Sequence, residues 1–360
     1  MAGKNYKQEK MRFSFPKQAL LGIFVLLSFC CQAAQPINGA GSSAAYPIYR
    51  LWAEHLGRDG GLALNYDPVG SSAGLKKARE RQVDFGATDV APKADQLQRD
   101  GLLLFPTVIT GVVPVLNLPR HDKGLVLDGP TLAGIFLGEI TRWDAPEIRA
   151  LNPSVNLPAK AITVVVRSDG SGSSYHFADY LAKVSPAWKQ RMGVASTLKW
   201  PAGFVGAVGS KGVVEAVRAT PGAIAYVDYN YVQEARLQSV ALKNAEGAVV
   251  EASPSSFDEA LIASQWLVGG DFTQTLTAQP GKRSWPITMG TFVVLPRVAE
   301  HPEQARQVAK FFTDAFMRGD ELAKKASFVR LPGSVQAKAF RVLSEMVDKQ
   351  GRPLAVTVLR

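Results

Sequence analysis

The hydrophobic positions along this chain follow two different spacings. Compact apolar runs, several of them rich in Val and Ile, predict strands at residues 62–66, 83–88, 102–115, 162–166, 223–229 and 291–295. Apolar residues three and four positions apart predict helices at residues 46–56, 74–81, 174–182, 213–219 and 302–316. Strands that alternate with helices in this way are typical of a layered α/β protein.

The length of the chain favours two lobes, because its 360 residues exceed the size of an average single domain. Two apolar strands, 107–115 and 285–295, are suited to cross from one lobe to the other. We therefore expect a discontinuous first lobe of residues 34–112 and 287–360, and a second lobe of residues 113–286. Hinged folds that hold a ligand between two lobes are connected in this way.

The N-terminus has the layout of a secretory signal peptide, which predicts export. An apolar run at 20–29 precedes the small residues Ala33 and Ala34, so we expect cleavage beside them and removal of residues 1–33. The basic residues before the run are Lys4, Lys7, Lys10, Arg12 and Lys17. A membrane anchor is the alternative, but a spanning helix needs ~20 apolar residues and this run is shorter.

Composition excludes several classes of function. Both cysteines, Cys30 and Cys31, lie in the signal segment, so the rest of the chain has no disulfide, thiolate metal site or cysteine nucleophile. The histidines have no metal-ligand spacing, and we expect no metal or cofactor. The formal net charge is +10; the signal segment, with five basic residues and Glu9, contributes +4, and the remaining +6 is compatible with attracting small anions. No basic run exceeds two residues, which argues against nucleic acid as a partner. Translation of the chain starts at either Met1 or Met11.

Four Gly/Ser-rich turns are the main chemical feature. They lie at residues 39–43, 70–74, 84–89 and 167–173, and three of them lead into a predicted helix. Such a turn offers backbone N–H groups and hydroxyls at the positive end of the helix dipole. The turns also contain one cation, Arg167, and one isolated acceptor, Asp89. This combination suits a small oxyanion that still carries a proton.

The turn at Arg167 follows a strand, so Arg167 stands at the carboxyl end of that strand, where ligands bind in open α/β sheets. Ser171, Gly172 and Ser173 can supply N–H groups and hydroxyls at a helix N-terminus. Asp169 can orient the guanidinium through a bidentate pair. The alternative interpretation is an Asp-Gly turn followed by a serine helix cap.

Asp89 ends the strand 83–88 and is either a turn or cap residue or a ligand group. A carboxylate that faces an anion repels it unless the anion donates a proton. A protonated oxyanion then forms a charge-assisted hydrogen bond, and a fully ionised one is rejected.

The turn at 70–74 also matches G-x-S-x-G, with Ser72 in the position of a nucleophile between a strand and a helix. A serine hydrolase would need a later acid and a histidine, and only His121, His176 and His301 follow. The anion interpretation instead uses Ser71, through its hydroxyl and its N–H group.

Together these residues resemble a known family, the periplasmic phosphate-binding proteins of phosphate-specific ABC transporters (PstS type). The resemblance covers essentially the whole chain after the signal segment. The motifs that carry it, in order, lie at residues 39–41, 69–72, 83–89, 105–107, 167–174, 221–224 and 285–288.

The resemblance implies a two-lobe periplasmic-binding-protein fold of type II, with a ligand cleft between lobes joined by two crossover strands. It assigns phosphate contacts to Ser43, Ala44, Ser71 and Asp89 on the first lobe and to Arg167, Ser171, Gly172 and Ser173 on the second. Asp169 is implied to hold Arg167 in place. Position 43 is Ser where many relatives have Thr, and position 44 is Ala where they often have Phe.

The function implied is capture of inorganic phosphate in the periplasm by a monomer, with delivery to the permease and ATPase of an ABC importer. No covalent chemistry is expected. Two alternatives remain at this point. One is a secreted serine hydrolase or phosphatase that uses Ser72, and the other is a secreted phosphate scavenger or adhesin of the same fold.

Overall fold

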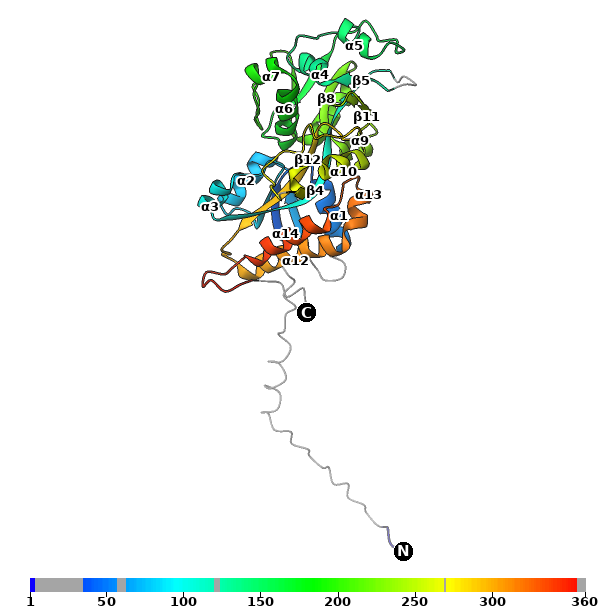
Figure 1. Cartoon of the computed structure of the whole chain (residues 1–360). Coiled ribbons are helices and arrows are strands. Elements are labelled where there is room, and N and C mark those ends of the chain that lie inside the picture. Colours follow the sequence, from blue (N-terminus) through cyan, green and yellow to red (C-terminus); the bar gives the residue numbers. More distant parts are fainter. Residues whose placement is uncertain (4–34, 57–62, 120–123, 269, 355–360) are drawn as a thin grey trace. The chain divides into compact units, whose positions relative to one another are not determined.

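The computed structural model describes residues 1–3, 35–56, 63–119, 124–268 and 270–354 (Figure 1). The predicted signal peptide lies almost entirely outside these residues, and its cleavage site lies outside them too. In the described part of the chain, no helix is both long and apolar enough to cross a membrane.

A nine-stranded mixed sheet organises the chain from residue 35 onward, in the order β2-β1-β3-β12-β4-β8-β6-β7, with β9 paired to β4. Its strands are β1 (Ile37–Gly41), β2 (Leu64–Asp67), β3 (Phe85–Thr88), β4 (Leu102–Leu116), β6 (Thr163–Arg167), β7 (Val205–Ala207), β8 (Ala223–Asp228), β9 (Gln238–Ser239) and β12 (Thr288–Pro296). A small second sheet has the order β11-β10-β5 and contains β5 (Val126–Asp128), β10 (Ala241–Lys243) and β11 (Val249–Val250).

Helices cover the sheet, with α1 and α12 packed together near one end and α4, α6 and α7 near the other (Figure 1). The first seven are α1 (Tyr46–Leu56), α2 (Ser71–Arg79), α3 (Ala94–Asp100), α4 (Gly129–Phe136), α5 (Pro146–Leu151), α6 (Gly172–Val184) and α7 (Pro186–Arg191). The others are α8 (Gly209–Ala219), α9 (Tyr229–Ala235), α10 (Pro254–Ile262), α11 (Gln265–Val268), α12 (Pro302–Arg318), α13 (Asp320–Lys325) and α14 (Gly333–Ser344).

Strand β4 runs through both halves of the sheet. Residues 102–111 pair with β12, whereas residues 112–116 pair with β8. At the change of partner, the backbone N–H of Val112 donates to the carbonyl of Ile287 at 2.8 Å, and Trp285 Nε1 donates to the Val112 carbonyl at 3.0 Å. The two segments expected to cross between lobes therefore lie side by side, paired antiparallel from Thr288 opposite Gly111 to Pro296 opposite Leu102. We call the part with β1, β2, β3 and β12 the first half, and the part with β6, β7 and β8 the second half.

Aromatic side chains build the core of each half. In the first, Phe312 of α12 meets Phe85 and Phe105 edge to face, with ring centroids 5.1 and 5.4 Å apart. In the second, Phe177 of α6 stacks on Tyr226 of β8 at 4.2 Å. Full burial of a side chain of this size stabilises the fold by roughly 1.5–3 kcal/mol. This packing fixes where the strand ends and helix starts lie.

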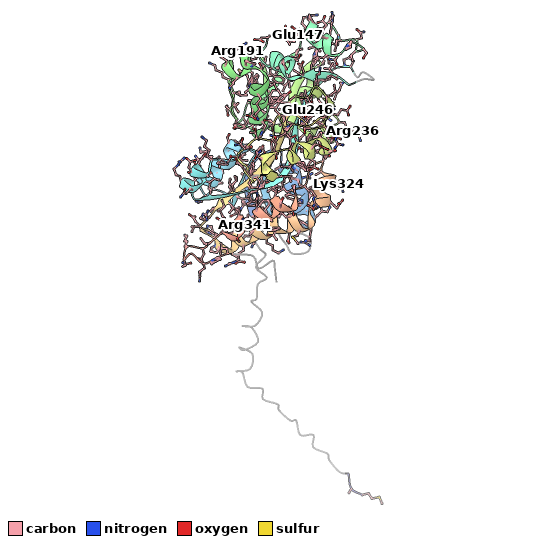
Figure 2. All side chains as sticks on the ribbon, viewed as in Figure 1. Glu147, Arg191, Arg236, Glu246, Lys324 and Arg341 are labelled. Atoms are coloured by element: carbon pink, nitrogen blue, oxygen red, sulfur yellow. The ribbon has the colours of Figure 1, made fainter. Side chains whose placement is uncertain are left out.

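Charged side chains mostly lie on the outside. Those labelled in Figure 2 are all exposed, namely Glu147, Arg191, Arg236, Glu246, Lys324 and Arg341. Four charged residues depart from this pattern. Asp348 is 3% exposed and pairs with Arg352 at 2.6 Å, away from the others, whereas Asp89, Arg167 and Asp228 are 2%, 4% and 0% exposed. Since a buried charge is costly unless it is paired or hydrogen-bonded, the group of Asp89, Arg167 and Asp228 marks the place where the fold holds unusual chemistry.

Candidate functional site

The three turns that were predicted to lead into helices do so, ahead of α1, α2 and α6. They come together with the ends of β3, β6 and β8. The predicted site residues Ser43, Ser71, Asp89, Arg167, Ser171 and Ser173 are all buried. Because positive helix ends gather here, the place favours negative charge.

Asp89 follows β3, and hydroxyls hold both of its carboxylate oxygens. Ser71 Oγ donates to Oδ2 at 3.0 Å, and Thr291 Oγ1 of β12 donates to Oδ1 at 2.6 Å. Burial raises the pKa of Asp89 above its ordinary value, although these hydroxyl hydrogen bonds act in the opposite direction. A carboxylate in this setting is a strong acceptor for one further proton.

The N-terminus of α6 lies directly against Asp89. A Cβ atom on Gly172 would stand 2.4 Å from the Cβ and Oδ2 of Asp89 and 2.7 Å from Ser71 Oγ. Only glycine fits in this space. In the described chain, the backbone N–H groups of Ser43, Ser71, Gly172 and Ser173 have no hydrogen-bond acceptor. All four belong to predicted ligand positions.

The predicted Arg167–Asp169 pair is present and bidentate. Nε donates to Oδ1 at 2.7 Å and Nη2 to Oδ2 at 2.5 Å, while Nη1 lies 3.4 Å from Ser210 Oγ. Burial by itself acts to raise the pKa of Asp169, but the hydrogen bond and charge of Arg167 outweigh it, and the pKa lies below its ordinary value. The guanidinium is therefore fixed in orientation; Nη1 donates to Ser210 Oγ and has a second N–H group that can face a ligand.

The remaining predicted positions serve the local fold as well. Ser171 Oγ accepts from the N–H of Ser174 at 3.2 Å and caps α6, as the alternative interpretation of this turn expected. The N–H of Ala44 donates to Ser42 Oγ at 3.2 Å, so it is already engaged. The Ser43 carbonyl accepts from the hydroxyl of Tyr231 at 2.9 Å.

A second buried carboxylate, Asp228 at the end of β8, was not predicted from the sequence. Ser173 Oγ donates to its Oδ1 and Ser210 Oγ to its Oδ2, each at 2.6 Å. Ser210 Oγ also lies 2.9 Å from Ser43 Oγ, which joins the two halves of the sheet. One signal was available, because Asp228 ends an apolar strand just as Asp89 does.

Ser72 does not have the surroundings of a hydrolase nucleophile. Its side chain is exposed, and its backbone N–H donates to the Gly170 carbonyl at 3.1 Å. Among the residues that the structure describes, no histidine or carboxylate forms a hydrogen bond with its hydroxyl; His176 instead contacts the backbone carbonyl of Asp89 through Nε2 at 2.6 Å. His121 lies outside the described residues.

Comparison with known proteins identifies the family. A family model described as the PBP superfamily domain matches residues 31–315. The phosphate-binding protein PstS of Haemophilus influenzae is 40% identical over 303 residues, which are 84% of this chain and 90% of that protein. That of Pasteurella multocida is 40% identical over 324 residues, 89% of this chain and 94% of that protein. The chain belongs to the PstS family.

Solved structures agree with the fold of this PstS family member. A periplasmic phosphate-binding protein, PfluDING, bound with phosphate, superposes with a TM-score of 0.68 at 22% identity, over 85% of this chain and 93% of that one. A phosphate-binding protein from Stenotrophomonas maltophilia gives a TM-score of 0.63 at 19% identity, over 85% and 93%. The family and the two-lobe fold implied by the sequence motifs are thereby confirmed.

One hollow in the described chain locates the opening of the site. A cavity of about 660 Å³ has Ser43 and Ser210 in its wall, together with the basic residues Arg50, Lys211 and Arg218. It connects the hydroxyls of the site with the surface.

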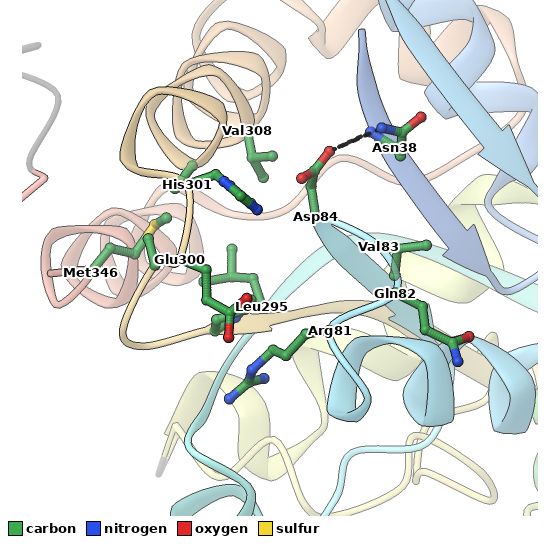
Figure 3. A pocket seen from close by; sticks show the side chains of 13 residues that line it. Asn38, Arg81, Gln82, Val83, Asp84, Leu295, Glu300, His301, Val308 and Met346 are labelled. Atoms are coloured by element: carbon green, nitrogen blue, oxygen red, sulfur yellow. Dashed lines mark hydrogen bonds between the residues drawn. The ribbon is translucent and has the colours of Figure 1, made fainter. Parts of the chain in front are cut away.

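The second hollow, of about 120 Å³, lies beside β1 and the start of α12 (Figure 3). It contains none of the predicted site residues. There Asp84, at the far end of the 84–89 turn from Asp89, accepts from the backbone N–H of Asn38 at 2.7 Å. Within the described ranges no group of three or more His, Cys, Asp or Glu side chains could hold a metal ion.

Proposed function

We propose that this PstS family member binds inorganic phosphate, as hydrogen phosphate, and passes it to the permease and ATPase of an ABC importer. The names of its relatives support phosphate as the ligand. The observation that carries the proposal is the buried Asp89 carboxylate beside the N-terminus of α6. A proton acceptor within a group of free N–H donors fits an anion that is partly protonated.

In the proposed complex, the hydroxyl of hydrogen phosphate donates to Asp89. The other phosphate oxygens accept from backbone N–H groups and from the guanidinium of Arg167, which Asp169 orients. The proposed contacts are Ser43, Ala44, Ser71, Asp89, Arg167, Ser171, Gly172 and Ser173. The charge-assisted bonds among these are roughly twice as strong as neutral ones.

Closure of two lobes on the anion would complete the site. We assign residues 34–112 and 287–360 to the first lobe and residues 113–286 to the second. Phosphate favours the closed form only through contacts with both lobes. Asp89 and Arg167 supply one such contact each, from opposite sides of the cleft.

The N-terminal segment supports export, so we place the mature protein in the periplasm after removal of residues 1–33. It acts there as a monomer, binds without covalent chemistry and needs no cofactor. It is not an enzyme in this proposal.

Titration calorimetry on mature protein, freed of ligand by unfolding and refolding, tests the function. We expect tight one-to-one binding of phosphate and no heat with sulfate, because sulfate brings no proton for Asp89. The Ser72→Ala variant should bind phosphate as the wild type does. Folded protein that binds neither anion would contradict the proposal, and ester hydrolysis lost in Ser72→Ala would favour the hydrolase.

The close approach of Gly172 to Asp89 gives a second prediction. Gly172→Ala places a Cβ against Asp89 in the closed form, and overpacking of this kind costs roughly 1–3 kcal/mol, so phosphate affinity should fall about 5- to 150-fold. The thermal midpoint of the ligand-free protein should change much less, because opening relieves the contact.

Gly212→Ala in α8 is the matched control. The atoms nearest to a Cβ there belong to Ala207, at 3.8 Å or more, so no neighbour has to move. Phosphate affinity should be unchanged in this variant. If Gly172→Ala binds phosphate as tightly as Gly212→Ala, Gly172 does not lie at the closing surface.

A further inference from the structure

The site contains two buried carboxylates, and the proposed function, on which this inference rests, uses only one of them. Asp89 accepts the proton of hydrogen phosphate. Asp228 is fully buried, and in the described chain it forms no ion pair with a Lys or Arg side chain. Its oxygens instead accept the hydroxyls of Ser173 and Ser210. Asp228 therefore needs a role of its own.

The hydrogen bonds to Asp228 use serine protons that would otherwise be available to an anion. A serine hydroxyl has a single proton, so Ser173 and Ser210 cannot donate elsewhere while they donate to an ionised Asp228. Ser210 then accepts from Ser43 across the 2.9 Å contact, which engages the Ser43 proton as well. The hydroxyls of Ser43 and Ser173, two of the proposed contact residues, are thus engaged by Ser210 and Asp228 and are not free for the anion.

A count of charges shows the same conflict. Asp169 neutralises Arg167 through the bidentate pair. Asp89 and Asp228 are then left without a cation, and hydrogen phosphate would add two negative charges. Its one proton goes to Asp89, so none remains for Asp228. Like charges in a buried site strongly favour protonation of one group.

We propose that Asp228 takes up one proton from solvent when the anion binds, and that this turns the hydroxyls of Ser43 and Ser173 toward the anion. The new O–H on Oδ2 donates to Ser210 Oγ, Ser210 donates to Ser43, and Ser43 donates to the anion. Ser173 leaves Oδ1, because the oxygen of a neutral acid is a weaker acceptor than a carboxylate. Only the O–H bond of Asp228 forms, and Asp228 thereby acts as a positioning residue.

The surroundings of Asp228 favour its neutral form. Burial, and after it the charge of Asp89, raises its pKa above the ordinary value, while Arg167 and the two hydroxyls act in the opposite direction. The other titratable groups that sense it are His176 of α6 and Tyr231 of α9. The 660 Å³ cavity reaches Ser210, which touches Asp228, and gives protons a route from solvent.

Titration calorimetry of phosphate in buffers of different ionisation enthalpy measures the proton uptake. The experiment is done at mildly alkaline pH, where phosphate is nearly all hydrogen phosphate. The wild type should take up close to one proton for each phosphate bound. Asp228→Asn should take up almost none, because the amide already donates as the neutral acid would. Its phosphate affinity should stay within about tenfold, the worth of one hydrogen bond.

Ser174→Ala is the matched control. Ser174 is a buried serine of the same helix, but its hydroxyl contacts Tyr226 at 2.7 Å and not Asp228, so proton uptake should match the wild type. Should Asp228→Asn fail to fold, Ser210→Ala replaces it. Loss of one donor leaves Asp228 protonated before the anion arrives, so uptake should fall below that of the wild type.

Infrared difference spectroscopy identifies the group that is protonated. Phosphate should produce the C=O band of a protonated carboxyl in the wild type and in Ser174→Ala, and none in Asp228→Asn. Phosphate binding without proton uptake in the wild type overturns this inference alone. Uptake that persists in Asp228→Asn also overturns it. Absence of phosphate binding in the wild type overturns the proposed function itself.

Discussion

Arg167→Ala is expected to weaken phosphate binding by roughly 30-fold to several thousandfold, since truncating one partner of a buried charge pair costs about 2–5 kcal/mol. The site loses its one guanidinium, and Asp169 is left without its bidentate partner. Arg167→Lys should fall between the wild type and alanine, because an ammonium keeps the charge but cannot form the same fork. Titration calorimetry measures all three.

The Arg218→Ala variant distinguishes a direct contact with phosphate from general electrostatic attraction of the anion. Arg218 is exposed and lines the cavity that opens on the site. Its removal changes the net charge of the protein by the same amount as removal of Arg167. Any loss of phosphate affinity should be small and should vanish at high salt. If the two alanine variants behave alike, Arg167 acts through the long-range field and does not contact the anion.

Asp89→Asn is expected to remove the rejection of sulfate. The carboxylate accepts a proton that sulfate lacks, whereas an amide can donate to an unprotonated oxygen. Sites built around such a hydrogen bond prefer the ligand that forms it by about 10⁴–10⁵-fold over one that does not. Asp89→Asn should lose most of this preference for phosphate over sulfate. Phosphate affinity should fall less than sulfate affinity rises. Competition between the two anions at neutral pH measures the change in their ratio.

Asp84→Asn provides the control for this change. It makes the same substitution in the same Gly-containing turn, but Asp84 contacts Asn38 beside the hollow of Figure 3 and lies outside the site. Sulfate should remain excluded. A variant Asp89→Asn that still excludes sulfate would show that another group accepts the phosphate proton.

The elements with strong periodicity were predictable from the sequence. The helix predicted at 46–56 is α1, with the same bounds, and the apolar run at 102–115 is β4 to within one residue. Both patterns are long, and each is compatible with only one kind of secondary structure. The helix predicted at 74–81 instead begins at Ser71, because Gly70 serves as its N-cap and the Ser pair forms its first turn.

Strand β1 gave no such signal, since its sequence is Ile-Asn-Gly-Ala-Gly. Its glycines allow the neighbouring strand β3 to approach closely. A Cβ on Gly39 would stand 2.2 Å from the ring of Phe85, and one on Gly41 would stand 2.0 Å from the Ala87 carbonyl. Tertiary packing therefore decides this strand, and residue patterns do not reveal it.

The site residues also divide into those that a local motif predicts and those that only the fold brings together. Motifs within one turn, such as Arg167 with Asp169, were visible because the partners are two residues apart. The contacts of Asp228 were not, since Ser173 lies 55 residues away. Each residue alone resembles an ordinary strand end or helix start. Only the fold brings them together.

The free N–H groups of Ser43, Ser71, Gly172 and Ser173 have a consequence for the energy use of a transporter. Closure without an anion buries donors that no acceptor satisfies, at about 1–3 kcal/mol for each. If two lobes close on the anion as proposed, we expect these donors to favour the open form of the ligand-free protein. An importer that responds to the closed form would then seldom hydrolyse ATP for an empty carrier.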